Sequence, residues 1–251
     1  MAAMEAERLF SGLIGAEYDM LTLICPAAAE ISLKVGEYVA QWQPGYACGG
    51  PLAAYEIGCG TGITSLALLS GRPDLRLTAI DSEPVMLEQA RVHLADWLEL
   101  GRLRLVETDA LSGLKTLPAD SLDLVASGYA IHNFLEPYRR EVLREILRVL
   151  KPGGLFVNGD RYALDDVREH VQATQDEVRH YFKTFTGIGR LDLLETWIVH
   201  LFSDESENHI MRLGPSIATM ESAGYTAIRV EYRCGVNALL TAQKPRVDSK
   251  Q

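Results

Sequence analysis

The sequence has few cysteines, and they are not arranged for cross-linking. Its 251 residues include only 4 cysteines, at positions 25, 48, 59 and 234, with no C-x-x-C pair among them. A chain of this length can bury a core without disulfide bonds. We therefore expect free thiols, a reducing compartment and a cytoplasmic protein.

Long apolar segments are also missing. No apolar run is long enough to cross a bilayer, and Glu5, Glu7 and Arg8 interrupt the segment where a signal peptide would need its apolar centre. We expect no membrane association. The composition, with 47% hydrophobic and 23% charged residues, is typical of a globular protein.

The sequence has fewer positively than negatively charged residues. The chain has 24 Lys and Arg against 34 Asp and Glu, which gives a formal net charge of −10. Such a surface repels a phosphate backbone, so we expect no nucleic-acid partner. The arginine-rich segment at 139–148 also contains Glu141 and Glu145 at salt-bridge spacing, which is typical of a solvated helix face.

The third glycine of a dinucleotide-binding turn is absent. An apolar run at Tyr55–Ile57 leads into Gly58-Cys59-Gly60-Thr61-Gly62, and Ile63 follows at the position that G-x-G-x-x-G would continue. The pattern predicts a strand, a glycine turn and a helix start, where backbone N–H groups face a small nucleotide-like ligand. An NAD-dependent oxidoreductase becomes a remote alternative.

Short apolar runs alternate with helical patterns through the middle of the chain, which predicts an α/β fold. We expect a doubly wound, Rossmann-like sheet of seven strands, mostly parallel, that ends in an antiparallel hairpin at 225–243. The expected organisation has four parts. They are a helical cap at 1–50, an α/β core at 51–163, a helical insertion or lid at 164–210, and a closing helix and hairpin at 211–251.

The first of these parts contains an amphipathic stripe. Ile31, Val35, Tyr38, Val39 and Trp42 recur at helical spacing and stop before Pro44-Gly45. Further upstream, Tyr18 either lies over a ligand pocket or simply packs, and the sequence leaves both open. In the insertion, aromatic residues at 181, 182, 185 and 197 are better explained by ordinary helix packing than by a substrate pocket.

Acidic residues follow the second and third expected strands. Asp81 ends the run at 75–80, and Asp109 follows the run at 103–107. Ligands of open α/β sheets bind at the carboxyl ends of the strands. Asp81 is therefore placed to accept hydrogen bonds from ribose hydroxyls, and Asp109 with Ala110 to contact an adenine, with Met86 or Leu111 against its face.

These segments together resemble a known family. Glu56-Ile57-Gly58-Cys59-Gly60-Thr61-Gly62, Ala79-Ile80-Asp81, Thr108-Asp109-Ala110 and Leu147–Gly154 are similar, in order and spacing, to the motifs of class I S-adenosylmethionine-dependent methyltransferases. The resemblance covers residues 52–160. It implies S-adenosyl-L-methionine as cofactor, S-adenosyl-L-homocysteine as product, and a small-molecule acceptor. The expected cofactor-binding residues are Tyr18, Glu56, Gly58, Cys59, Gly60, Asp81, Ser82, Met86, Asp109, Ala110, Ser127 and Gly128.

His132 is the candidate catalytic residue. The segment Tyr129-Ala-Ile-His-Asn-Phe134 resembles the loop that carries the catalytic histidine of plant-type small-molecule O-methyltransferases. A near-neutral imidazole can accept the proton of an oxygen nucleophile. A histidine that only lines the cofactor pocket, or only packs, is the competing interpretation.

The sequence also suggests alternatives to methyl transfer. The regions around Tyr18–Pro26 and Ala223–Leu239 distantly resemble a synthase of carboxylated S-adenosylmethionine, although the insertion has no arginine at 197–202 to hold a carboxylate. A non-catalytic cofactor-binding protein is a third option. We expect no metal site, because His170 and His180 lie nearly three turns apart on one helix. The acceptor, the methylated atom and the oligomeric state are open, with a homodimer as one option.

Overall fold

One mixed β-sheet organises the molecule. The computed structural model describes residues 26–46 and 49–246, so Tyr18 lies outside the described residues. The sheet has seven strands in the order β3-β2-β1-β4-β5-β7-β6. The strands are β1 (Leu52–Ile57), β2 (Leu75–Asp81), β3 (Leu103–Glu107), β4 (Leu122–Gly128), β5 (Leu150–Arg161), β6 (Thr226–Cys234) and β7 (Asn237–Gln243).

Strands β1 to β5 are parallel, and β7 pairs antiparallel with both β5 and β6. The strand order reverses between β1 and β4, because β2 and β3 lie on one side of β1 and the later strands on the other. Ligands of open α/β sheets bind at such a reversal. The expected sheet and its antiparallel hairpin are confirmed.

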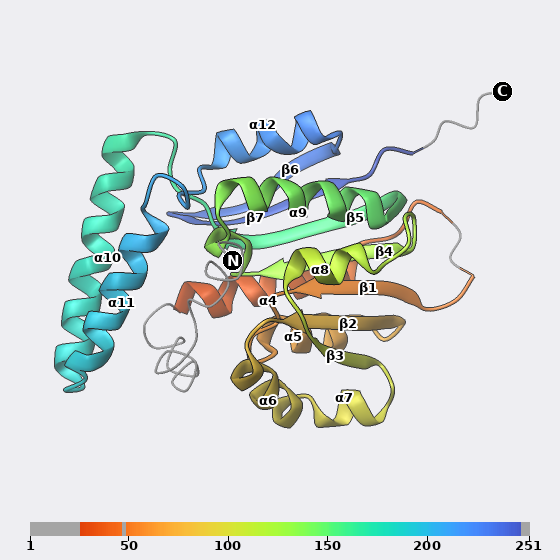
Figure 1. Ribbon diagram of the computed structural model, residues 1–251, viewed down its shortest axis with the longest axis horizontal. Helices are drawn as coiled ribbons and strands as arrows, with labels where there is room; N and C mark the ends of the chain where they lie inside the picture. The colour runs from red at the N-terminus through yellow and green to blue at the C-terminus, as the bar shows by residue number, and fades with distance from the viewer. Residues whose placement is uncertain (1–25, 47–48, 247–251) are drawn as a thin grey trace.

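Helices cover both faces of the sheet (Figure 1). Apolar residues of α4, α5 and α6 pack on one face, and those of α8, α9 and α12 on the other. The bounds of these helices are α4 (Pro26–Gln41), α5 (Ile63–Gly71), α6 (Pro84–His93), α8 (Ala110–Lys115), α9 (Glu136–Val149) and α12 (Leu213–Ala223). The short helices α7 (Ala95–Glu99) and η3 (Ile131–Asn133) lie in connections.

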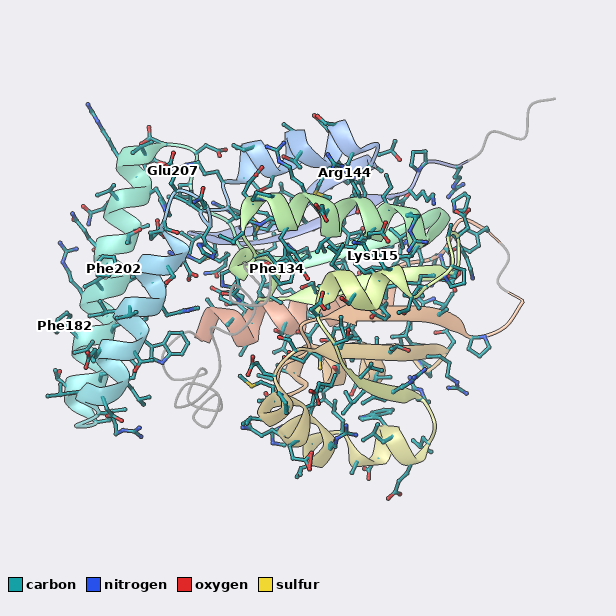
Figure 2. All side chains as sticks on the ribbon, in the orientation of Figure 1. Lys115, Phe134, Arg144, Phe182, Phe202 and Glu207 are labelled. Carbon is teal, nitrogen blue, oxygen red and sulfur yellow. The ribbon has the colours of Figure 1, made fainter. Side chains whose placement is uncertain are left out.

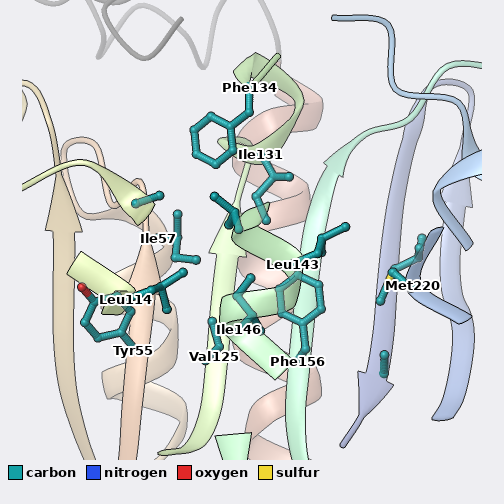
Figure 3. Close-up of a cluster of buried hydrophobic side chains, with 14 of the residues drawn as sticks. Tyr55, Ile57, Leu114, Val125, Ile131, Phe134, Leu143, Ile146, Phe156 and Met220 are labelled. Atoms are coloured by element: carbon teal, nitrogen blue, oxygen red, sulfur yellow. The ribbon is translucent and has the colours of Figure 1, made fainter. Parts of the chain in front are cut away.

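The strands carry apolar side chains toward both helix layers. Neighbouring residues alternate between the layers, as Tyr55 packs on the α8–α9 side and Ala54 on the α4–α5 side. Figure 3 shows part of the apolar cluster on the α8–α9 side, in which Tyr55, Leu114, Ile146 and Phe156 lie together. Burial on both faces explains why these strands are nearly continuous apolar runs.

The N-terminal stripe packs on the sheet. Ile31, Val35 and Val39 are fully buried, and α4 contacts α5, β4, β5 and β7. The described part of the expected cap therefore belongs to the helix layer of the core, because its apolar face needs the sheet to cover it.

The insertion forms a helical hairpin, α10 (Val167–Gly187) and α11 (Leu191–Asp204), which we call the lid hairpin. It stands at the end of the molecule, beyond the carboxyl ends of the strands (Figure 1). Tyr181, Phe185 and Trp197 are buried between the two helices and Ala28 of α4, as packing at helical spacing predicts. Phe182 and Phe202 point outward and are exposed (Figure 2).

Candidate active site

A pocket of about 560 Å³ lies at the carboxyl ends of β1, β2, β3 and β4. Its walls come from four segments: the glycine turn after β1, the β2–α6 junction, the start of α8 and residues 129–134 after β4. Concave sites at the strand ends of an open α/β sheet typically bind small molecules. We call it the strand-end pocket.

The glycine turn brings bare backbone to the pocket. Gly58 and Gly60 both have positive φ, at +67° and +53°. A Cβ on Gly58 would lie 2.4 Å from the Cβ of Ala130. Only glycine therefore allows the turn to approach the segment after β4 this closely.

Asp81 joins two sides of the pocket. One carboxylate oxygen accepts a hydrogen bond from the N–H of Gly60 at 2.8 Å, and the other accepts from the N–H of Glu83 at 2.9 Å. Burial raises the pKa of Asp81, and these backbone hydrogen bonds oppose that rise. A carboxylate has about four lone-pair positions, so Asp81 can still accept hydrogen bonds from a ligand's hydroxyl groups.

Asp109 does not line the pocket but holds the start of α8 beside it. It is the N-cap of α8, where its Oδ1 accepts from the N–H of Ser112 at 2.9 Å and from the hydroxyl of Tyr138, also at 2.9 Å. The Tyr138 oxygen in turn accepts from the N–H of Leu111. Burial acts to raise the pKa of Asp109, but the hydrogen bonds from Ser112 and Tyr138 outweigh it and lower the pKa. The neighbours Thr108 and Ala110 line the pocket instead.

Glu56 is fully buried beneath the glycine turn. Its carboxyl group accepts a hydrogen bond from Ser65, and its Oε1 has no hydrogen-bond partner among the described residues. Burial raises the pKa of Glu56 to about 8, and the nearby Asp81 adds to the rise. The side chain does not line the strand-end pocket.

The structure brings half of the expected cofactor-binding residues to the strand-end pocket. Its lining includes Gly58, Gly60, Asp81, Ser82, Met86 and Ala110. The expected residues outside this lining are Glu56, Cys59, Asp109, Ser127 and Gly128.

The expected residues outside the lining have structural roles. The Ser127 hydroxyl donates to the carbonyl of Ile57, and a Cβ on Gly128 would collide with Thr64 at 2.1 Å. Cys59 is buried, and burial raises its thiol pKa, as suits a packed thiol rather than a nucleophile.

His132 faces away from the strand-end pocket. It lies in η3 and is 4% exposed, and its Nδ1 is 2.6 Å from Oδ1 of the fully buried Asp160 on β5. Its ring packs edge-on against the ring of Tyr129, which lines the pocket, with centroids 5.2 Å apart. His132 lines a smaller cavity of about 200 Å³ with Asp204 and His209.

The sequence does not identify the residues that form the pocket wall after β4. Tyr129, Ala130, Asn133 and Phe134 all line the pocket, although only their segment, and not their side chains, stood out in the sequence. Tyr129 has a positive φ of 58°, which turns the chain sharply after β4 and directs the next residues into the pocket. No sequence pattern marks a non-glycine residue for that conformation.

Comparisons with known proteins agree with this geometry. Residues 54–154 match the methyltransferase domain family. Over this span the chain matches the class I S-adenosylmethionine-dependent methyltransferase domain that its motifs resemble. The expected family and its cofactor are thereby confirmed at the level of the domain.

The methyltransferase domain has relatives with a different named activity. A carboxy-S-adenosyl-L-methionine synthase of Klebsiella pneumoniae is 26% identical, over 86% of this chain and 82% of its own length. The enzyme of the same name from Trichlorobacter lovleyi is 24% identical, over 90% of this chain and 88% of its own.

Solved structures share the fold at lower identity. An O-methyltransferase family protein of Burkholderia thailandensis has a TM-score of 0.65 and 17% identity, over 99% of this chain and 65% of its own. The CurJ carbon methyltransferase has a TM-score of 0.61 and 15% identity, over 96% of this chain and 66% of its own. Proteins named for oxygen and for carbon methylation thus share this fold, and the fold alone does not select the methylated atom. No helix among the described residues is long and apolar enough to cross a membrane.

Proposed function

We propose that this methyltransferase domain binds S-adenosyl-L-methionine in the strand-end pocket and transfers its methyl group to a small-molecule acceptor. The proposal rests on the position of Asp81. Its carboxylate accepts hydrogen bonds from the backbone of the glycine turn and of the residue before α6, and Asp81 also lines the pocket. Because Gly58 has no side chain, a ligand can approach the backbone closely at this position.

Different residues of the pocket would contact different parts of the cofactor. Asp81 would accept the ribose hydroxyls, Gly58 and Gly60 would take the methionine end, and Met86 and Ala110 would cover the adenine. When bound, S-adenosyl-L-methionine supplies an electrophilic methyl group. The chain's own task is mainly to hold acceptor and donor in line, because positioning lowers the barrier of such a displacement most.

The acceptor would enter past Tyr129, Asn133 and Phe134, which form the wall beyond the glycine turn. This acceptor wall is mainly aromatic and amide in character and holds no Lys or Arg among the described residues. It suits a compact organic acceptor better than an anionic one. The acidic surface, with a net charge of −10, supports the same choice against nucleic acid.

O-methylation with His132 as base stays a prediction. Asp160 accepts from Nδ1 and would leave Nε2 as the proton acceptor, which is the arrangement of a histidine general base. However, Nε2 would need a route to the acceptor past Tyr129, and His132 is not in the lining. We therefore do not assign it to the transfer step.

A second candidate is a carboxy-S-adenosyl-L-methionine synthase-like activity. It is favoured by the relatives of that name, which align over 86% and 90% of this chain. The absence of a basic residue from the described lining argues against it. Mass spectrometry of the nucleoside products separates the two: methyl transfer yields S-adenosyl-L-homocysteine, and the synthase yields a sulfonium carrying one added carboxyl group.

Calorimetry with S-adenosyl-L-methionine and S-adenosyl-L-homocysteine tests the binding directly. We expect Asp81→Asn to weaken binding of both roughly 10- to 100-fold, because a charged hydrogen bond contributes about 1.5–3 kcal/mol. Asp96→Asn, the same change at an exposed position on α7, is the matched control and should bind as the wild type does. If the wild type binds neither ligand, the proposed function is wrong.

A further inference from the structure

A second cluster of polar side chains is buried beneath the lid hairpin. His132 from η3 meets His200 and Asp204 from α11, and all three are less than 9% exposed. One ligand atom from each lies within 4.8 Å of the other two. The cluster is separate from the strand-end pocket, and none of its residues lines that pocket.

Helical spacing places two of the three groups on one face. His200 and Asp204 are four residues apart on α11, so both side chains project from adjacent turns. Nε2 of His200 lies 3.6 Å from Oδ2 of Asp204. Two ligands of a tetrahedral ion with bonds of about 2.1 Å lie about 3.4 Å apart, so this pair needs almost no movement to bind one metal ion.

Asp160 orients the third group. Its Oδ1 lies 2.6 Å from Nδ1 of His132, and its Oδ2 accepts from the backbone N–H of the same residue at 3.2 Å. A carboxylate that holds Nδ1–H leaves the Nε2 lone pair available as a ligand. Metal-binding histidines almost always have such a partner on their other nitrogen.

The charges around the cluster are unbalanced. Four carboxylates, those of Asp160, Glu177, Asp204 and Glu205, surround it together with two guanidiniums, those of Arg139 and Arg161. With every imidazole counted as neutral, including that of His170 beside Glu205, the sum is 2 − 4 = −2. One divalent cation would balance the charge.

The cluster also has open coordination capacity. Oδ1 of the buried Asp204 has no hydrogen-bond partner among the described residues, and neither does Nε2 of His209. Asp204 and His209 face the same small cavity, which His132 also lines. A buried carboxylate oxygen without a partner is costly unless something binds it.

We propose that His132 Nε2, His200 Nε2 and Asp204 bind one divalent transition-metal ion, with the cavity leaving a fourth position for His209 or a small exogenous ligand. Two imidazoles and a carboxylate favour Zn²⁺ and its neighbours over Mg²⁺ or Ca²⁺, which prefer oxygen ligands. The site does not depend on the proposed methyl transfer, because it uses none of the residues of the strand-end pocket.

The sequence predicts no metal site, because His170 and His180 lie too far apart on one helix to share an ion. The cluster instead joins residue 132 to residues 200 and 204 across the whole lid hairpin. Only the fold brings them together, so the spacing of His170 and His180 was uninformative.

Co²⁺ and Zn²⁺ binding to the chelator-treated full chain tests the site. We expect one Co²⁺ per chain, visible ligand-field absorption of a four- or five-coordinate site, its displacement by Zn²⁺, and a rise in Tm that a chelator reverses. Asp204→Asn and His200→Gln should each weaken binding at least tenfold. His180→Ala removes an exposed histidine of α10 and should bind as the wild type does.

Two results would overturn the site. One is Co²⁺ binding that is equally weak in the wild type, Asp204→Asn and His200→Gln. The other is Co²⁺ whose spectrum is that of the hexaaqua ion. Because Asp204→Asn keeps the shape of the side chain, circular dichroism should show it folded, so its loss of metal can be read independently of stability. Binding of S-adenosyl-L-homocysteine, measured in parallel, reports on the strand-end pocket alone.

Discussion

Replacing Gly58 with alanine tests whether bare backbone is essential at the strand-end pocket. The residue has a φ of +67°, and an added Cβ would lie 2.4 Å from the Cβ of Ala130. The left-handed backbone costs an alanine about 1–2 kcal/mol. The overlap of the two Cβ atoms adds about 1–3 kcal/mol, because the segment after β4 must shift to relieve it.

Gly101→Ala separates these two contributions. Gly101 has nearly the same φ, +63°, but no heavy atom lies within 4 Å of the position that a Cβ would take. We expect Gly101→Ala to lose only the backbone contribution to the free energy of unfolding, measured by urea denaturation. Gly58→Ala should lose about twice as much or more, and should weaken binding of S-adenosyl-L-homocysteine at least tenfold in calorimetry, since the turn and the acceptor wall move apart.

Identical behaviour of the two variants would refute this explanation of the turn. Equal losses of stability would mean that the segment after β4 yields without cost. Unchanged ligand binding in Gly58→Ala would mean that the ligand does not approach this backbone. Either result can be interpreted because Gly101 lies in an exposed turn after α7, away from the strand-end pocket.

Two further predictions concern buried polar groups. Burial raises the pKa of Glu56 from its ordinary 4.5 to about 8, so between those pH values the native state keeps a proton that the unfolded chain has released. The free energy of unfolding should therefore fall by about a few kcal/mol as pH rises through that window, and Glu56→Gln should flatten the fall in urea denaturation at pH 5 and pH 8. Tyr138→Phe removes the hydroxyl that donates to Asp109 and accepts from Leu111 N–H, and thermal unfolding should show a loss of about 1–2 kcal/mol. A wild-type profile in Glu56→Gln, or an unchanged Tm in Tyr138→Phe, would contradict these assignments.

Most of the fold could be predicted because local patterns and layer packing agree. Apolar runs of strand length alternate with helical stripes, and the stripes of the core helices pack on a sheet face, as those of Ile31, Val35 and Val39 do. The two lid helices lie within the helical insertion predicted at 164–210. The start of β5 departs from the local pattern. Pro152, Gly153 and Gly154 are typical loop residues, but the strand already begins at Leu150, which pairs with Leu122.

The pocket could be predicted only where topology determines position. Asp81 and the glycine turn follow strands that are neighbours in the sheet, so both had to reach one edge. Glu56 lies one residue before Ile57 on the same strand, and strand alternation turns its side chain into the interior instead of toward the strand-end pocket. The contacts between η3 and α11 join residues nearly seventy positions apart, and no local pattern could have paired them.

The buried side chain of Arg139 links the acceptor wall to the segment that follows the lid hairpin. The Arg139 guanidinium donates to the carbonyls of His132 and Phe134 at 3.1 and 2.7 Å, and to the carbonyl of His209 at 2.5 Å. The first two carbonyls position the turn that carries Phe134 into the strand-end pocket. The third belongs to the segment that follows α11. Tyr129 of the same wall also packs against the buried cluster of the lid hairpin. If the wall binds the acceptor as proposed, these contacts connect the insertion to the choice of acceptor.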